Sequence, residues 1–353
     1  IMPSLVGSEM CIRDRIYTGP QFYINNPLYK NPRQQCILNS DYDAIDLEKI
    51  NDDFSARTNY VPCTSLEEYN SLIKGFPKGQ DEDGNTIYEN WMDYYKVGFR
   101  KMLSQAGERT LICALLPRKS AHINGVISVD MTAMCSSIVM DFYMKTVGAS
   151  NLQSSRMDSF PLVVEEKYRK ALHGRTLRLN CVTNRYADLW SEVWDASYKH
   201  EQWSIKDKRL APWDTLTEEW NNDTPLRNYF ERRMALVEID VLAAMALGLT
   251  LDELIMMYEI QFPVLQQNEN DTWYDRHGRI VFTCSKGLIG VGVDRPTWNH
   301  IREMHPGETY AHTLTSELYA GQTITYEAPF TCCDRIADYR TAWTHFERRF
   351  NQK

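Results

Sequence analysis

The polar stretch KTVGASNLQSSRMDSFPL, which begins at Lys145, has side chains suited to contacting DNA. The amides of Asn151 and Gln153 can pair with the edge of adenine, and the guanidinium of Arg156 can donate two hydrogen bonds to guanine. Lys145 and Ser154 can contact phosphates, which position a protein on DNA without reading its sequence. These residue types predict a base-reading loop, while a polar surface loop without such a role is the alternative.

A second polar loop, RKSAHIN, follows the apolar run RTLICALLP. Arg118 and Lys119 lie beside a serine, a combination suited to the phosphate backbone. His122 and Asn124 complete the predicted DNA-binding set. We therefore expect the two loops to divide the work, with backbone contacts from this loop and base contacts from the loop that carries Arg156.

The run Asn26-Pro27-Leu28-Tyr29 differs by one residue from the NPP(Y/F) loop with which amino-methyltransferases hold a flipped adenine. In that loop the asparagine side chain and the proline carbonyl accept hydrogen bonds from the adenine amino group. Leu28 stands where the motif has its second proline. A proline turn without catalytic function is therefore favoured, and no catalytic residue is assigned.

The glycine-rich run Gly287-Leu288-Ile289-Gly290-Val291-Gly292 could bind a nucleotide phosphate only if it joined a strand to a helix. Arg295-Pro296 argues against an immediate helix, so a flexible loop is expected. Two further groups of ionisable residues are expected to be ordinary surface or core side chains, because neither group has the spacing of a nuclease or zinc site. No metal ligand is assigned. The two groups are Asp158 with Glu165, Glu166 and Lys167, and His300 with Glu303, His305 and His312.

Charge is distributed unevenly along the chain. The net charge is -8, yet residues 96–185 contain 14 Lys and Arg against 6 Asp and Glu. A basic middle third in an acidic chain indicates one module that meets a polyanion, with chance patchiness as the alternative. The 43% hydrophobic content is typical of a globular protein, and no apolar run is long enough for a membrane span, so no membrane partner is expected. Nine cysteines without a CxxC pair favour a reduced, cytoplasmic location.

The apolar periodicity and the turn residues predict an α+β fold. We expect a mixed target-recognition domain with short strands and helices, followed by a mainly helical C-terminal region with a β-hairpin. Residues 16–90 read as loops with short strands. The expected elements are a helix at 91–104, a strand at 109–116, a helix at 132–147, a Trp-rich helix at 186–198, a helix at 226–247 capped by Asp223 or Thr224, a helix with a Thr250–Glu253 capping box, a hairpin at 273–283 and a helix at 335–350.

Several blocks of the sequence resemble one family. YKVGFRKMLSQAGERTLICALLPRKSAHINGVISV and SSIVMDFYMKTVGASNLQSSRMDSFPL resemble the target-recognition domain of type IIG-like restriction-modification and phage-defence adenine-specific DNA methyltransferases. FERRMALVEIDVLAAMALGLTLDELIMMYEIQFPVL and APFTCCDRIADYRTAWTHFERRF resemble the C-terminal helical region of the same proteins. The similarity covers most of the chain beyond Ile16.

The resemblance implies a division of the chain into three parts. Residues 16–90 would form a connecting region, 91–185 the DNA target-recognition domain and 186–353 the mainly helical C-terminal region. The partners implied are double-stranded DNA and an N-terminal catalytic half, which uses S-adenosylmethionine in the parent protein. No cofactor and no convincing catalytic core are expected in the chain itself, so its own enzymatic activity is left open.

Residues 1–15 include LVGSEMCIRDR, which resembles a translated sequencing adapter and shows neither a leader pattern nor a helical or strand period. On this interpretation the gene is incomplete and the catalytic half lies upstream. A protein-interaction or scaffolding module without a DNA-reading role is the competing hypothesis. Its partner surface would be formed by four tryptophans, namely Trp190, Trp194, Trp203 and Trp213.

Overall fold

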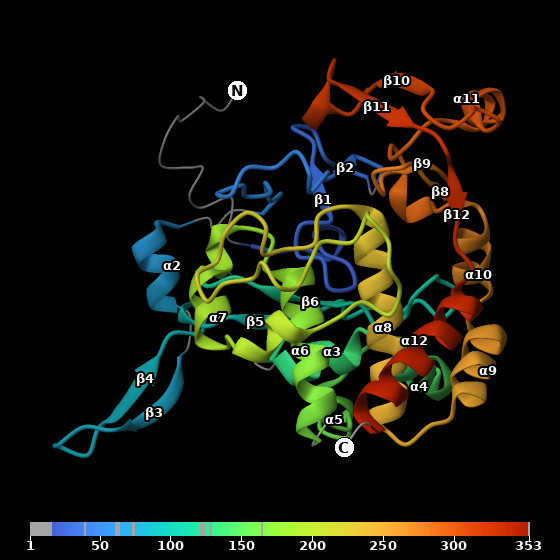
Figure 1. The fold of residues 1–353 in the computed structure, drawn as a ribbon. Coiled ribbons are helices and arrows are strands. Elements are labelled where there is room, and N and C mark those ends of the chain that lie inside the picture. Colours follow the sequence, from blue (N-terminus) through green and yellow to red (C-terminus); the bar gives the residue numbers. More distant parts are fainter. Residues whose placement is uncertain are drawn as a thin grey trace.

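The computed structural model describes residues 16–351 except 39, 61–63, 73, 74, 121–124, 127, 128 and 164. Helices and short antiparallel strands are mixed along the chain, which confirms the predicted α+β class (Figure 1). The helices are α2 Leu66–Leu72, α3 Val129–Cys135, α4 Ile138–Val147, α5 Ser154–Met157, α6 Glu166–Asn180, α7 Ala187–Glu192, α8 Tyr229–Ala246, α9 Leu251–Gln261, α10 Pro263–Asn270, α11 Arg295–Ile301 and α12 Arg335–Asn351.

In the described part of the chain, the strands form five small sheets. A hairpin of β3 and β4 extends away from the body of the molecule at the lower left of Figure 1. The strands are β1 Lys30–Pro32, β2 Tyr42–Ala44, β3 Phe76–Gln80, β4 Thr86–Glu89, β5 Lys96–Phe99, β6 Cys113–Leu116, β7 Gly125–Val126, β8 Thr272–Tyr274, β9 Ile280–Thr283, β10 Thr309–Thr313, β11 Thr323–Glu327 and β12 Thr331–Cys332. Short 3-10 turns lie at η1 Gly19–Gln21, η2 Trp91–Asp93, η3 Asn184–Tyr186, η4 Ala196–His200, η5 Lys286–Leu288 and η6 Glu317–Tyr319.

The sheet β6-β5-β7 lies at the centre of the fold. Strand β5 pairs antiparallel with both neighbours, and every residue of β5 and β6 is buried. Gly98 permits a close approach to Leu116, because a Cβ atom there would lie 2.7 Å from a Leu116 methyl carbon. The predicted helix at 91–104 is therefore wrong: pairing with β6 and β7 outweighs the local helical spacing.

Helix α8 contacts several other helices, among them α6, α12 and α4. It begins later than predicted, at Tyr229, because Asn228 is its N-cap and forms a capping box with Glu231. The amide of Leu226 instead donates to the Arg178 carbonyl over 2.8 Å, which holds this residue outside the helix. The predicted end at Gly248 is confirmed by its left-handed conformation, φ +74°.

Other helical predictions are confirmed with changed boundaries. The helix predicted at 132–147 is two helices, because Ser137 caps α4 and separates it from α3. The Trp-rich helix is likewise divided into α7 and η4 by a new cap at Asp195. The Thr250–Glu253 capping box and the hairpin that turns at Gly278 are present as predicted.

One hydrophobic cluster contains side chains from all three predicted segments, from Leu28 to Phe346. It joins the central sheet to α3, α4, α6, α8, α9 and α12. Smaller clusters lie between the N-terminal segment and β6, and within the C-terminal strands. Among the described residues, no helix is both long and apolar enough to cross a bilayer.

Candidate nucleic-acid interface

The predicted base-reading loop lies at the end of β5. Helix α4 stops at Gly148, which adopts a left-handed conformation, and the chain then runs beside the segment that follows β5. The amide of Leu103 donates to the Ser150 carbonyl over 3.0 Å, and the amide of Leu152 donates to the Lys101 carbonyl over 2.8 Å. These two bonds place Asn151 opposite Met102 and give the loop a defined position.

The base-reading candidates remain accessible in this loop. Asn151 and Gln153 are exposed, and Arg156 is half-buried in the short helix α5. Ser154 is the first residue of α5, but its side chain is outside what the structure describes. The three candidates for base contacts thus lie on one short segment fixed to the central sheet.

Lys145 does not extend into this loop. Its ammonium donates to the carbonyls of Gln105 and Gly107, each over 3.1 Å, and the side chain is buried. Burial lowers the pKa of this amine. Lys145 therefore closes the turn before β6 and is not placed to contact a phosphate.

The loop with Arg118 and Lys119 makes ion pairs within the chain. Arg118 contacts Asp188 over 3.2 Å and Glu192 over 2.8 Å, both in α7. Lys119 pairs with Asp93 and has a left-handed backbone with φ +62°. Both cations are partly exposed, so DNA would have to compete with these carboxylates. The remaining candidates of this loop, His122 and Asn124, lie outside the described residues.

The two predicted loops lie at opposite ends of β5. The Lys119 amide donates to the carbonyl of Met92, which precedes β5, over 2.6 Å. Asn151 is paired with Met102, which follows β5. The structure therefore does not gather both loops into one cluster, and it keeps the base-reading candidates apart from Arg118 and Lys119.

A groove of about 940 Å³ lies beside the base-reading loop. One wall is the segment from Gly98 to Ser104, and the other comes from the N-terminal segment. Aromatic and basic side chains line it, namely Tyr17, Phe22, Tyr23, Tyr29, Phe99, Lys30, Arg100 and Lys101. Tyr17, Phe22 and Phe99 are buried, whereas Tyr23 and Tyr29 are half-buried.

The rings and cations of the groove contact one another. Tyr23 and Tyr29 stack with their centroids 4.9 Å apart. The Arg100 guanidinium lies over Tyr23, 5.4 Å from the ring centre, and also donates to the Phe22 carbonyl over 2.5 Å. Burial is the main cause that raises the pKa of Tyr23 and Tyr29, so both phenols stay neutral. Aromatic faces beside cations are the combination that binds unstacked bases and their phosphates.

The Asn26–Tyr29 run lies at the edge of this groove, directly after a turn at Ile24 and Asn25 that the pair Tyr23 and Asn26 closes. The Asn26 side chain accepts from the amide of Leu28 over 3.1 Å, which makes a second turn around Pro27. This second turn agrees with the proline-turn interpretation. The side-chain oxygen of Asn26 is therefore engaged within this turn. Asn26 and Tyr29 also line a smaller cavity of about 170 Å³, whose wall includes Glu108. Burial raises the pKa of the Glu108 carboxyl.

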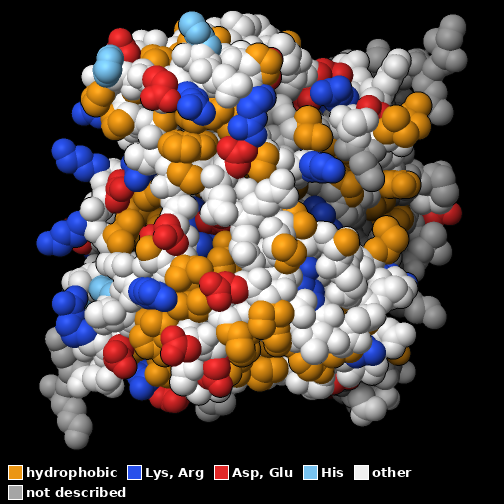
Figure 2. All heavy atoms as spheres, turned by 90° about the vertical axis from the view of Figure 1, so that its right-hand side faces the viewer, with side chains coloured by type: hydrophobic (Ala, Val, Ile, Leu, Met, Phe, Trp, Pro, Cys, Tyr) orange, Lys and Arg blue, Asp and Glu red, His pale blue; other side chains and the backbone are white. Residues whose placement is uncertain are grey.

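Part of the basic charge of the middle third lies inside the fold. Five of its 14 Lys and Arg are buried, so the uneven charge predicted from the sequence is partly internal. On the face formed by the C-terminal elements, acidic and basic side chains are interspersed (Figure 2). The five buried cations are Lys96, Arg109, Lys145, Arg175 and Arg178.

The tryptophans of the competing hypothesis are largely structural. Trp190 and Trp213 are buried, and their indoles pack against Trp194 and Trp203 respectively, with ring centroids 5.4 Å apart in each pair. These rings fill the core around α6 and α7. Trp190 and Trp213 are therefore not available to a partner, and Trp194 and Trp203 are half-buried.

Comparisons with protein-family models, curated proteins and solved structures found no match to this chain. Within the described residues, no group of three or more His, Cys, Asp or Glu side chains is placed to hold a metal ion. The candidate site therefore rests on the geometry of the groove and its loop.

The groove residues were missed because their signal is weak. In the run YTGPQFYINNPLYK, the aromatic spacing fits neither a helix nor a strand. Only Asn26 to Tyr29 of this run resembles a known motif. An aromatic residue directly before a basic one, Tyr29 before Lys30 and Phe99 before Arg100, is the sequence signal that the two walls share.

Proposed function

We propose that this chain binds DNA through the aromatic and basic groove and reads sequence with the adjoining loop. The observation that carries the proposal is the groove itself, because it combines aromatic faces with Lys30, Arg100 and Lys101. Phosphates of a duplex bind such cations, and only a base that has left the duplex stack can lie on such a ring. The groove is large enough for more than a single side chain or ion.

The position of the loop supports this function. Met102 lines the groove and is 82% exposed, and its backbone neighbours hold Asn151 in register. A DNA segment held in the groove would therefore lie next to the amides of Asn151 and Gln153 and to Arg156. These side chains suit adenine and guanine edges.

The resemblance extends the proposal to the parent protein. We place the chain as the target-recognition and C-terminal portion of an S-adenosylmethionine-dependent adenine DNA methyltransferase of restriction-modification or phage defence. Its partners would be double-stranded DNA and an N-terminal catalytic half, in the cytoplasm. Base contacts here would then choose the site, and the other half would supply the cofactor and the methyl transfer.

Binding of labelled duplex DNA, followed by fluorescence anisotropy between low and physiological salt, tests the proposal. A site of about five phosphate contacts should give a log-log slope of about -4 to -5. Lys101→Ala should weaken binding and reduce the slope by about 1. Lys199→Ala, an exposed lysine of η4 outside the groove, is the matched control. Absent or salt-independent binding would favour an interaction module instead.

A further inference from the structure

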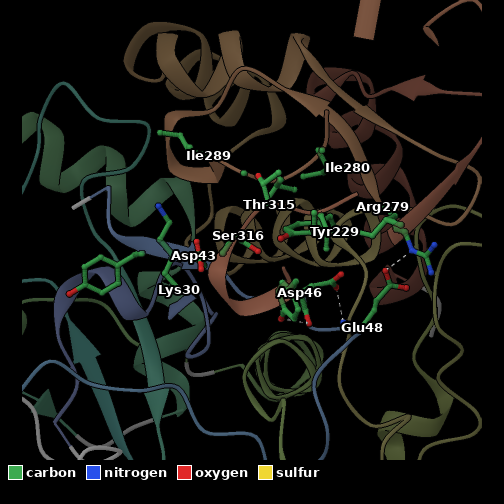
Figure 3. Close-up of a pocket in the computed structure, with 18 of the residues that line it drawn as sticks. Lys30, Asp43, Asp46, Glu48, Tyr229, Arg279, Ile280, Ile289, Thr315 and Ser316 are labelled. Carbon is green, nitrogen blue, oxygen red and sulfur yellow. Dashed lines mark hydrogen bonds and ion pairs between the residues drawn. The ribbon is translucent and has the colours of Figure 1, made fainter. Parts of the chain in front are cut away.

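A second large cavity, of about 480 Å³, lies between the N-terminal segment and the C-terminal strands. Its walls come from residues 30–48 on one side and 279–326 on the other, so it exists only in the folded chain. Figure 3 shows Lys30 and Ile289 on one side of it and the Arg279–Glu48 pair on the opposite side, with Tyr229 and Asp46 between them. The volume is within the range of small-molecule sites.

Two ion pairs neutralise part of the charge in this cavity. Arg33 contacts Asp43 over 2.9 Å, and Arg279 contacts Glu48 over 3.0 Å. The Asp43 carboxylate also accepts from the amide of Leu318 over 3.0 Å. These side chains are already engaged and form the walls of the cavity.

Three charged groups in the cavity make no ion pair with any residue that the structure describes. They are the ammonium groups of Lys30 and Lys286 and the carboxylate of Asp46. One Asp46 oxygen accepts from the amide of Glu48 over 3.0 Å, and its backbone amide donates to the Tyr319 hydroxyl over 3.0 Å. These bonds fix the carboxylate in place. The cavity therefore offers two cations and one acceptor to a ligand.

A hydrogen bond joins the two segments that carry these lysines. The Tyr29 hydroxyl donates to the Gly287 carbonyl over 2.5 Å, which joins the chain neighbours of Lys30 and Lys286. The glycine-rich run continues along this wall, where Gly290 has φ +86° and no atom lies within 4 Å of a Cβ built there. A negatively charged group here would meet two ammonium groups and an accessible backbone.

The glycine-rich run does lie between a strand, β9, and a helix, α11. Helix α11 does begin at Arg295, with Pro296 in its first turn, so the expectation of no immediate helix is wrong. Asp294 caps this seven-residue helix, so its N-terminus is already occupied and is not the anion site. The lysines and the glycine-rich wall are the candidate anion contacts.

We propose that this cavity binds a nucleoside phosphate. The phosphate would contact Lys30 and Lys286, a sugar hydroxyl or base amino group would donate to Asp46, and the base would lie against apolar and aromatic side chains. Among the lining residues, Tyr229, Ile280, Ile289, Leu314, Ile324 and Tyr326 supply that surface. The cavity adjoins the groove and shares Lys30 with it, whereas Lys286 and Asp46 line only the cavity.

Calorimetric titration of the full chain tests the proposal, with AMP, GMP, CMP and UMP as probes. At least one nucleotide should bind more tightly than its nucleoside and more tightly than inorganic phosphate, because both ends of the ligand are recognised. S-adenosylmethionine serves as a contrast, since its sulfonium adds positive charge beside the lysines. Binding of S-adenosylmethionine without any nucleotide, or equal binding of phosphate alone, would overturn the proposal.

Two variants and two controls locate the binding. Lys286→Ala and Asp46→Asn should each weaken nucleotide binding about tenfold or more, because each removes a charge-assisted contact. Lys199→Ala should have no effect. Lys101→Ala, which lines only the groove, should weaken DNA binding and leave nucleotide binding unchanged. Nucleotide binding that survives both cavity variants would place the ligand elsewhere and refute the assignment.

Discussion

Arg175 of α6 donates from Nε to the Glu238 carboxylate of α8 over 2.6 Å, with both side chains fully buried. The same guanidinium reaches Glu201 over 2.7 Å. Glu201 also pairs with Arg349 near the end of α12. Glu238 of the ERRMALVEID block thus joins α8 to α6 within the core, which gives this residue a structural role.

Removing one member of this buried network should destabilise the fold strongly. Glu238→Ala leaves part of the Arg175 charge without a partner, at an expected cost of about 3 to 5 kcal/mol in the free energy of unfolding. Urea denaturation followed by circular dichroism measures it. Glu192→Ala, which breaks an exposed pair with Arg118, should change the midpoint little. Equal effects of the two variants would refute the distinction.

A hairpin turn and a helix cap meet at Gly278. This glycine has φ +85°, and a Cβ atom there would lie 2.5 Å from the Asn228 side-chain oxygen that caps α8. Gly278→Ala should therefore combine backbone strain with loss of the cap, and cost about 2 kcal/mol or more. Thermal unfolding is the measurement.

The matched control for Gly278 is Gly84 in the β3–β4 turn. It has a similar φ of +81°, but no atom lies within 4 Å of a Cβ built there. Gly84→Ala should lower the melting temperature only through backbone strain, and so by less than Gly278→Ala. A loss as large at Gly84 would show that the contact with Asn228 is unimportant.

Burial of Glu108 should make stability depend on pH. Burial raises the pKa of this carboxyl above its unfolded value of 4.5, so the folded state holds the proton more tightly. Its ionised form is therefore disfavoured in the fold, and stability falls as pH rises from the unfolded pKa through the raised pKa. Glu108→Gln should remove this loss and keep the contact with Asn268.

Melting temperatures of wild type and Glu108→Gln, measured between pH 5 and 8, test this. The advantage of the variant should grow with pH. Glu82→Gln, at an exposed position of the β3–β4 turn, should behave as wild type. A Glu108→Gln variant that is less stable at neutral pH would mean that the carboxylate is favoured in the fold.

On the proposed function, Arg156 and Lys119 should affect DNA binding differently. Arg156→Ala should cost about 1 to 3 kcal/mol on the cognate sequence and hardly change binding to random DNA. Lys119→Ala, if DNA displaces Asp93, should weaken all sequences alike and lower the salt slope by about 1. The measurement is competition binding with the catalytic half restored.

Asp93→Asn provides a check on the second loop. It frees Lys119 from its ion pair, so it should strengthen binding to all sequences alike, most at low salt. Equal losses on cognate and random DNA for both alanine variants would mean that the loops bind charge without reading sequence.

Some features followed from local chemistry alone. The Thr250–Glu253 capping box, the end of α8 at Gly248 and the turn at Gly278 each depend on a few adjacent residues, so their patterns predicted them. The polar loop that carries Asn151 was found for the same reason, because a helix-stopping glycine precedes it.

Contacts between distant residues decided the rest. The 91–104 segment has helical spacing, but β6 and β7 pair with it as a strand. The pairing of Arg109 with Asp141 in the core, over 2.6 Å, likewise depends on residues far apart in the chain. The groove and the second cavity each join segments far apart in the chain. The sequence by itself determined the α+β class and many caps and turns, because these depend on neighbouring residues. Only the tertiary structure decided which charges are internal and where a ligand has room, because the burial and the ion-pair partner of a side chain depend on which surfaces meet.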